Sequence, residues 1–332
     1  MPKRPILRRA HLAQLALGVC SLALLASHPA SAQADAYPNK PITIVVAYPP
    51  GGSTDLTGRN FGQELSTRLG VPVVIENIGG AGGAIGAQKV ANAAPDGYTL
   101  LVGANNEVAI NRLVTSAVKY KLTDFTPIGM IASQPLVLVA STNTGVKTIG
   151  EFLQRTKANP GKFSYGSSGV GTSLHLAGEM VKEQAGVFLT HIPYRGVAPL
   201  ANDLLGGNLE YGVFVLSSGL PHIRSGKVVA LGTTEAKRSA VTPDIPALAE
   251  HPALKGIDIS TWFVLMGPAK MPEPVVARLK KALADTLQSP EFRKKMEAAS
   301  STVPTTPVDI QKFLVDETAK YQKIVDFAKI KE

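Results

Sequence analysis

Three short segments rich in Gly, Ser and Thr could bind an anion through their backbone. They are PPGGSTD (49–55), IGGAGGAIG (78–86) and GSSGVGTS (166–173), and each follows a predicted strand and precedes a predicted helix. The first turn of a helix has unpaired N–H groups and carries a partial positive charge. Glycine lets the backbone approach a ligand closely, and a Ser or Thr hydroxyl adds a donor. These turns therefore predict anion binding without a lysine.

Helix capping and nucleotide binding are the alternative roles for the same turns. Ser, Thr and Asp also stabilise helix starts as ordinary caps, and a single turn is explained well in that way. Three turns at strand ends favour a ligand site, because such sheets bind ligands at the carboxyl ends of parallel strands. GAGGAIG (80–86) departs from the dinucleotide fingerprint in its spacing, and no acidic residue closes a strand about twenty residues later. A dehydrogenase is therefore not favoured.

The residues that could do hydrolytic chemistry do not form a recognisable set. Ser167 and Ser168 lie near His175 in the sequence, but there is no G-x-S-x-G elbow. His175 falls at the start of a predicted helix, where capping or packing is the simpler role. His191 and His222 lack the spacing of metal ligands. We expect no catalytic residue, no metal and no cofactor, and keep an exported hydrolase as the less favoured alternative.

The elements that would position these turns alternate along the chain. Strands are predicted at 42–48, 71–77, 98–103, 127–133, 135–141, 162–169, 190–196, 209–216 and 227–234. Helices are predicted at 56–69, 84–93, 150–158, 172–184 and 199–205, and two amphipathic helices at 273–288 and 308–330. Strands separated by helices of this length predict an α/β fold with doubly wound, mainly parallel sheets.

The N-terminus has the pattern of an export signal. Lys3, Arg4, Arg8 and Arg9 precede an apolar run from 12 to 26, and small residues ASA follow at 30–32. We predict a cleavable signal peptide over residues 1–32, with Ala34 as the near alternative, since the apolar run is short for a membrane span. The Arg8-Arg9 pair leaves Sec and twin-arginine export both open. The expected location is the periplasm.

The composition of the chain excludes further kinds of site and partner. The 332 residues favour two domains over one, and the formal net charge of +9 falls to about +5 (9 − 4) without the signal. Cleavage also removes Cys20, the only cysteine, so neither a disulfide nor a catalytic thiol is expected. No basic tract is interleaved with aromatic residues, so nucleic acid is not an expected partner. A modest positive charge suits small anions.

Longer segments of the chain resemble one family of receptors. The matching segments are YPNKPITIVVAYPPGGSTDLTGR, VPVVIENIGGAGGAIGAQKVANAAPDGYTLLVG, ANPGKFSYGSSGVGTSLHLAGE, HIPYRGVAPLANDLLGG, SGLPHIRSGKVVALGTT and TWFVLMGPA. They resemble the tripartite tricarboxylate transporter receptors, also called the Bug family of bacterial solute-binding proteins. The resemblance implies a two-domain, type II periplasmic-binding-protein fold that closes on its ligand by a hinge with two crossovers. Domain 1 is expected at 35–133 plus 259–332, and domain 2 at 134–258.

The resemblance also implies a ligand site between the domains. One carboxylate is expected against the backbone of the first loop and the following turn, at Tyr48, Gly51, Gly52, Ser53, Thr54, Asp55, Gly80, Ala81, Gly82 and Asn105. The other end of the ligand is expected at Ser168, Gly169, Thr172, Ser173, Tyr194, Arg195, Gly196 and Phe214. A carboxylate needs less charge compensation than a triphosphate, so the first loop does not require a lysine.

Two positions depart from the family pattern. Arg195 stands where members often have Lys, and an arginine can bind a carboxylate with two hydrogen bonds. Phe214 stands where many members have an Asp that can pair with a ligand ammonium. Phe214 therefore argues against amino-acid ligands and for an apolar or aromatic body between carboxylates. The alternative, that Phe214 points into the core, stays open at this stage.

The expected function is that of a monomeric periplasmic receptor for a small carboxylate. A dicarboxylate or an aromatic acid would be captured in the cleft and delivered to a tripartite tricarboxylate-type membrane permease. A ligand-sensing partner of a membrane sensor kinase is the alternative.

Overall fold

The architecture is a mixed α/β fold built around two long neighbouring strands. The computed structural model describes residues 37–330, so the predicted signal peptide and its cleavage site lie outside the described residues. The strands are β1 (Ile42–Val46), β2 (Val73–Asn77), β3 (Thr99–Ala104), β4 (Phe125–Ser141), β5 (Ser164–Ser167), β6 (Thr190–Pro193), β7 (Tyr211–Val215), β8 (Val228–Thr233) and β9 (Ser260–Pro268). They run in the order β2-β1-β3-β9-β4-β7-β5-β6, and β8 pairs with β4.

The helices follow the strands closely along the chain. They are α2 (Ser53–Leu69), α3 (Ala84–Ala91), α4 (Asn111–Val114), α5 (Ile149–Ala158), α6 (Ser173–Ala185), α7 (Val197–Gly206), α8 (Leu216–Arg224), α9 (Glu273–Leu287), α10 (Pro290–Ala298) and α11 (Ile310–Ala328). A π-helical turn at Asn106–Ile110 leads into α4. None of these helices within residues 37–330 is both long and apolar enough to cross a membrane.

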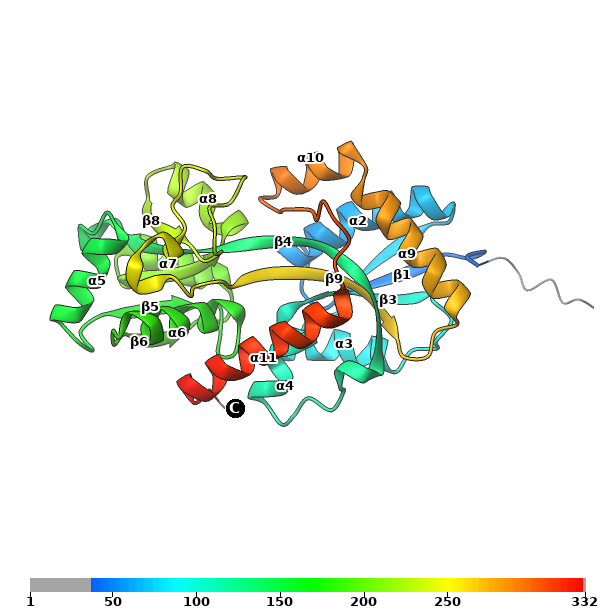
Figure 1. Ribbon diagram of the computed structural model, residues 1–332, viewed down its shortest axis with the longest axis horizontal. Coiled ribbons are helices and arrows are strands. Elements are labelled where there is room, and N and C mark those ends of the chain that lie inside the picture. The colour runs from blue at the N-terminus through cyan, green and yellow to red at the C-terminus, as the bar shows by residue number, and fades with distance from the viewer. Residues whose placement is uncertain (1–36, 331–332) are drawn as a thin grey trace, which may run out of the picture. The chain divides into compact units, whose positions relative to one another are not determined.

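The strands form a parallel set at each end of the sheet order. β1 pairs in parallel with β2 and β3, and β5 pairs in parallel with β6 and β7. In β1 the run ITIVV is buried at four of its five positions, as is typical of a strand covered on both faces. Figure 1 shows β4 and β9 running together from one parallel set to the other.

Strand β4 differs from the sequence prediction. Residues 127–133 and 135–141 were expected to be two strands, but they form one strand of 17 residues. It pairs antiparallel with β9 as far as Pro135, and from Leu136 on it pairs with β7 and β8. A proline cannot donate to a ladder, so a position where the strand changes partners tolerates it. Register shifts at 127–129 and 130–132 also bend the strand.

The core lies on both faces of these strands. Neighbouring residues of β7 point to opposite faces: Val213 and Val215 pack in one buried cluster, and Phe214 packs in another with Val137 and Leu200. Helix α11 packs against α6, β4 and the π-helical turn. Residues from Lys40 onward form one compact unit.

Candidate functional site

A cavity of about 440 Å³ lies at the ends of the strands where the Gly-rich turns meet. We define its first wall as Tyr48, Pro49, Pro50, Gly52, Ser53, Thr54, Gly82, Ala104, Asn105 and Asn106. The second wall is Ser168, Thr172, Ser173, Leu174, Gly196, Val197 and Val215, and Thr261 of β9 completes the lining. Ten of the eighteen residues predicted for the site line this cavity, and all three Gly-rich turns contribute to it.

Three helices begin at the cavity. Helix α2 follows Gly52, α6 follows Thr172 and α7 follows Gly196. The N-caps Gly52 and Gly196 provide no side-chain hydrogen bond, whereas the Thr172 hydroxyl accepts one from the N–H of His175. The described residues that line the cavity include no Lys, Arg, Asp or Glu. Its positive potential therefore comes from helix starts rather than from a cation.

Asp55 holds the first loop in place. Its Oδ2 accepts hydrogen bonds from the Gly51 N–H at 2.8 Å and the Arg59 guanidinium at 3.0 Å, and its Oδ1 accepts from the Asn77 amide at 2.9 Å. Burial opposes ionisation of Asp55, but these hydrogen bonds outweigh it and lower the pKa of the carboxyl. The Asn77 amide also donates to the Tyr48 carbonyl. Asp55 and Gly51 do not line the cavity, and Asp55 braces the loop behind it.

A buried carboxylate that the sequence analysis missed supports the same wall. Glu107 has no exposed surface, and it accepts hydrogen bonds from the Tyr48 hydroxyl and the Ala104 N–H, each at 2.6 Å. Its own carbonyl accepts from the Tyr120 hydroxyl. Burial raises the pKa of Glu107 to about 7, against the effect of the two hydrogen bonds. The signal in the sequence was a lone acid in the apolar stretch of 106–114.

The turn over 80–83 has an unusual backbone. Gly80, Ala81, Gly82 and Gly83 all have positive φ, a region that glycine enters without strain. The Asn111 amide fixes this turn by donating to the Gly82 carbonyl at 2.8 Å. Gly82 lines the cavity as predicted, but Gly80 and Ala81 do not.

The second wall is braced by neutral histidines. The Ser167 hydroxyl and His191 Nε2 lie 2.7 Å apart, and His175 Nδ1 accepts a hydrogen bond from the Gly171 N–H. The two imidazole rings stack with centroids 3.7 Å apart. Burial lowers the pKa of His175 to about 4, and burial together with His175 lowers that of His191 to about 3. Ser167 is fully buried and does not line the cavity, so this pair supports the loop below Ser168 and Gly169.

The second wall touches the first wall at one point and β9 at another. The Ser173 N–H at the start of α6 donates to Asn106 Oδ1 at 3.1 Å, and the Ser173 and Thr261 hydroxyls lie 3.3 Å apart. Asn105, which lines the cavity, donates its amide to the Ser260 carbonyl and to the Tyr321 hydroxyl. Tyr321 also bonds Glu317 and Trp262. The cavity is thus connected to β9 and α11.

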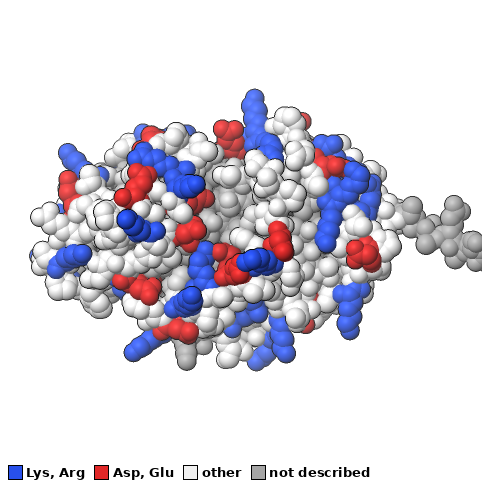
Figure 2. Space-filling model, viewed as in Figure 1, with Lys and Arg blue, Asp and Glu red and all other residues white. Residues whose placement is uncertain are grey.

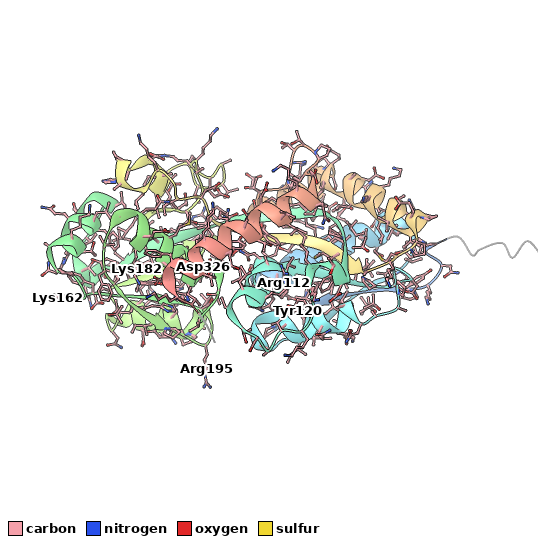
Figure 3. All side chains as sticks on the ribbon, turned by 60° about the horizontal axis from the view of Figure 1, so that its bottom comes forward. Arg112, Tyr120, Lys162, Lys182, Arg195 and Asp326 are labelled. Atoms are coloured by element: carbon pink, nitrogen blue, oxygen red, sulfur yellow. The ribbon has the colours of Figure 1, made fainter. Side chains whose placement is uncertain are left out.

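The other four predicted residues that do not line this cavity are Phe214, Arg195, Tyr194 and Gly169, and they correct the sequence analysis. Phe214 is 1% exposed and packs in the core, because Val215, its neighbour on the opposite face of β7, lines the cavity instead. Arg195 is exposed, does not line the cavity, and points away from the ribbon in Figure 3. The Tyr194 hydroxyl is used inside the fold, since it donates to Asp203 at 2.7 Å. Gly169 borders a neighbouring cavity rather than this one.

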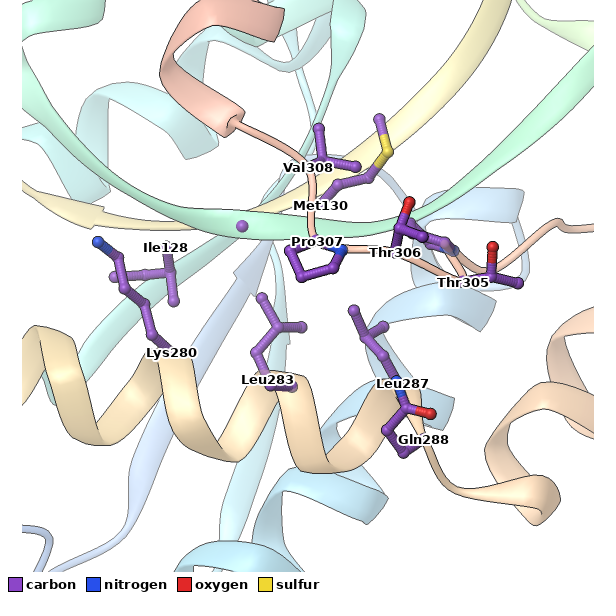
Figure 4. A pocket seen from close by; sticks show the side chains of 13 residues that line it. Ile128, Met130, Lys280, Leu283, Leu287, Gln288, Thr305, Thr306, Pro307 and Val308 are labelled. Atoms are coloured by element: carbon purple, nitrogen blue, oxygen red, sulfur yellow. The ribbon is translucent and has the colours of Figure 1, made fainter.

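A smaller hollow of about 160 Å³ lies away from these residues (Figure 4). Ile128 and Met130 of β4, Leu283 of α9 and the segment 304–308 line it, and none of the predicted site residues does. Within residues 37–330, no three His, Cys, Asp or Glu side chains are grouped so that they could hold a metal ion.

Comparisons with known proteins show which family the chain resembles. Residues 58–330 match the family described as "Tripartite tricarboxylate transporter family receptor". Protein BugT of Bordetella pertussis is 34% identical over 301 residues, which cover 89% of this chain and 91% of BugT. These matches confirm the family resemblance seen in the sequence.

Two solved structures of Rhodopseudomonas palustris proteins share the fold. Rpa4515 with adipate has a TM-score of 0.81 at 31% identity, covering 89% of this chain and 99% of that protein. MatC with bound malate has a TM-score of 0.76 at 28% identity, covering 87% of this chain and all of MatC (100%). Another solved neighbour is the periplasmic binding protein BugD, with a TM-score of 0.77 at 32% identity, so the fold predicted from the resemblance is confirmed.

Proposed function

The chain belongs to the tripartite tricarboxylate transporter receptor family, and we propose that it captures a small dicarboxylate or aromatic acid in the periplasm. The observation that carries this proposal is the cavity where α2, α6 and α7 begin. A carboxylate at these helix starts would accept hydrogen bonds from N–H groups that have no partner within their helix. The family is one of substrate-binding receptors, so capture rather than chemistry is the function.

The residues that line the cavity indicate how much negative charge its ligand can carry. The described lining contains no cationic side chain, and two of the three helix starts have glycine N-caps. Helix starts stabilise a single negative charge by about 0.3–1 kcal/mol each at the surface and by more when partly buried. That suits a carboxylate better than a polyphosphate. The adipate and malate bound to the two R. palustris proteins support a dicarboxylate for this chain as well.

Capture requires two domains that close on each other. We propose domain 1 at 35–133 plus 259–332 and domain 2 at 134–258. The change of partners along β4 after Pro135 supports a boundary there, and Ser260, where β9 begins, supports the second. The contact between Ser173 and Asn106 joins the two sides, as expected of a closed state.

Membership of the receptor family also supports a proposal for the location and the partners of this protein. We propose that residues 1–32 are a signal that directs the monomeric receptor to the periplasm, where a membrane permease accepts the ligand. Delivery to a sensor kinase is the alternative, and genes for permease subunits or for a histidine kinase beside this gene would separate the two. On the face in Figure 2, side chains of both signs are interspersed, which gives no support to a nucleic-acid partner.

Thermal-shift screening of residues 33–332 tests the proposal. The protein is first unfolded and refolded to remove any ligand that copurifies, and is then tested with aliphatic dicarboxylates, tricarboxylates, aromatic acids and acidic amino acids. A ligand that binds only the folded state raises the melting temperature, by about 2.7 kcal/mol of added stability at 100 times its Kd. We expect a rise with dicarboxylates or aromatic acids.

The matched control is the diamide of each dicarboxylate, which has nearly the same shape without the charge. The diamide should leave the melting temperature unchanged. A rise with the diamide equal to that with the acid, or no rise with any acid, would show that the cavity does not recognise carboxylates.

A further inference from the structure

A second and larger cavity lies directly beside the first. Its volume is about 680 Å³, and it shares Gly82, Ser168 and Thr172 with the first cavity. Gly82 belongs to the first wall, and the other two belong to the second. The two spaces therefore meet at a neck formed by both walls.

The chemistry of this second cavity differs from that of the first. Ile85 is 54% exposed and Val170 is 36% exposed, and both line it, although large apolar side chains are usually covered. They come from opposite sides, since Ile85 follows the 80–83 turn and Val170 follows Ser168. Ala117 and Val118 extend the apolar lining, and among the described helices of eight or more residues α3 and, through its N-cap Thr172, α6 begin at this cavity.

One cation borders this space. Lys119 is the only charged residue among the described lining residues. Its ammonium donates to the Ser116 carbonyl at 2.9 Å and, within the described chain, forms no ion pair. An anionic group at the end of an apolar chain would find its counter-charge at Lys119.

We propose that the second cavity binds the apolar chain of a long dicarboxylate whose first carboxylate occupies the first cavity. The chain passes the neck at Gly82, Ser168 and Thr172, lies between Ile85 and Val170, and brings its far carboxylate to Lys119. This inference rests on the proposed function and narrows it to diacids longer than those bound by the two solved relatives. The exposed side chains of Ile85 and Val170 are therefore the reason to expect a ligand with an apolar chain. Phe214 is not, because it lies in the core.

A series of straight-chain diacids with four, six, eight and ten carbons tests this inference by titration calorimetry. Each buried methylene contributes about 0.8 kcal/mol, which is about fourfold in Kd at 25 °C. We expect binding to tighten by at least about tenfold from the six-carbon to the ten-carbon acid, after the cost of ordering the chain.

Two variants on opposite sides separate this cavity from the first. Ala117→Trp fills the space, and Val170→Asp places a negative charge on its apolar wall. Each should weaken binding of the ten-carbon acid at least about tenfold and change that of the four-carbon acid less than about twofold. Ala298→Trp, at an exposed position of α10 outside both cavities, is the matched control. Lys119→Met should weaken the ten-carbon diacid but not the ten-carbon monoacid.

The outcomes separate the two proposals. If the short diacids bind and affinity does not rise with length, or the variants weaken short and long acids equally, the long-chain inference is wrong and the proposed function stands. If no diacid binds, the long-chain inference is wrong, and the proposed function is wrong as well if no aromatic acid binds.

Discussion

The two walls of the cavity are held in place by groups of opposite ionic character. The first wall depends on the carboxylates of Asp55 and Glu107, and the second on the neutral imidazoles of His175 and His191. Burial raises the pKa of Glu107 to about 7 but lowers those of His175 and His191 to about 4 and 3. Because burial disfavours whichever form is charged, the same desolvation acts in opposite directions on an acid and a base.

The consequence is an opposite pH dependence at the two walls. Glu107 binds its proton more tightly in the folded state, so its contribution to stability is complete below pH 4.5 and is lost as pH rises through about 7. The histidines bind theirs less tightly, so their contribution is complete above pH 6.5 and is lost as pH falls toward about 4. The contributions of Glu107 and of the two histidines are therefore never both complete at the same pH.

The three helices at the cavity differ in how they begin, and α7 at the second wall starts without a side-chain cap, as α2 does. Helix α2 at the first wall starts after Gly52 without a side-chain cap, whereas α6 at the second wall is capped by Thr172. Away from the cavity, α5, α10 and α11 are capped by Thr148, Ser289 and Asp309, although α9 starts without a side-chain cap. The open start of α2 is the one where we expect a ligand carboxylate to take the place of a cap.

The largest expected effect comes from capping α2 with an acid of the chain itself. Gly52 has φ −80° and ψ 171°, and an added Cβ would meet only the Pro49 carbonyl at 4.0 Å, so Gly52→Asp fits without strain. Its carboxylate would occupy the ligand's position and repel it, weakening binding about 1000-fold (about 4 kcal/mol). Calorimetry with the acid found by the thermal-shift screen measures this loss.

Gly52→Asn is the matched control for that change. It can cap the helix equally well but adds no charge, so it should weaken binding much less than Gly52→Asp. Equal binding by wild type and Gly52→Asp would show that the ligand does not use the start of α2.

Glu107→Gln tests the pH dependence of the first wall. A shift from 4.5 to about 7 corresponds to about 3 kcal/mol, since each pKa unit is worth about 1.4 kcal/mol. The Glu107 contribution to wild-type stability should fall by up to about this amount between pH 4.5 and pH 7.5, against the rise contributed by His175 and His191, and the variant should lack only that fall. Urea unfolding at a series of pH values measures both.

Another acid contributes in the same range and must be separated from Glu107. Burial and then Asp258 raise the pKa of Glu235 to about 7, so Glu235 adds a fall of the same sign. The difference between wild type and Glu107→Gln isolates Glu107, and Glu235→Gln serves as the parallel control. Identical pH profiles for wild type and Glu107→Gln would remove Glu107 from the account of the first wall.

Asp55→Asn should cost about 2 kcal/mol of stability, because hydrogen bonds to a charged group contribute more than neutral ones. The amide cannot accept from Gly51, Arg59 and Asn77 as the carboxylate does. Thermal unfolding measures the loss, and ligand binding should weaken with it. Asp309→Asn at the N-cap of α11 is the matched control, since Asn caps a helix as well as Asp, and should change stability by less than about 0.5 kcal/mol.

Thr172→Ala has the smallest expected effect, a loss of about 1 kcal/mol of stability from the missing cap of α6. Thr148→Ala removes the equivalent cap of α5, far from the cavity, and should cost about the same. Only the first should also weaken ligand binding, because Thr172 lines the cavity. Equal effects of the two variants on binding would argue against a contact between Thr172 and the ligand.

The sequence predicted the parts of the site that depend on local backbone. The turns at Gly52, Gly82 and Ser168 could be recognised because glycine and hydroxyl residues at a strand end have few other uses. The orientation of a side chain on a strand could not be predicted, because a shift of one residue in register moves the side chain to the other face of the sheet. Phe214 and Val215 are an example.

Contacts between residues far apart in the chain could not be predicted from the sequence either. Pro135 indicated a break between two strands, but pairing with β9, which lies more than a hundred residues later, joined them into β4. Glu107 stood out in the sequence only as a lone acid, because its partner Tyr48, 59 residues earlier, is brought to it by the pairing of β1 with β3.

The position of β9 between β3 and β4 has a consequence for how the chain is made. A ribosome releases β1 to β4 first, yet the strand that joins β3 to β4 ends only at Pro268. Strands β5 to β8, in contrast, come from one continuous segment that can assemble as soon as it emerges. During synthesis, the edge of β3 therefore stays unpaired until most of the protein has been translated, and unpaired edges are templates for aggregation. Slow translation before residue 268 would lengthen that exposure, and a chaperone that covers the β3 edge would shorten it.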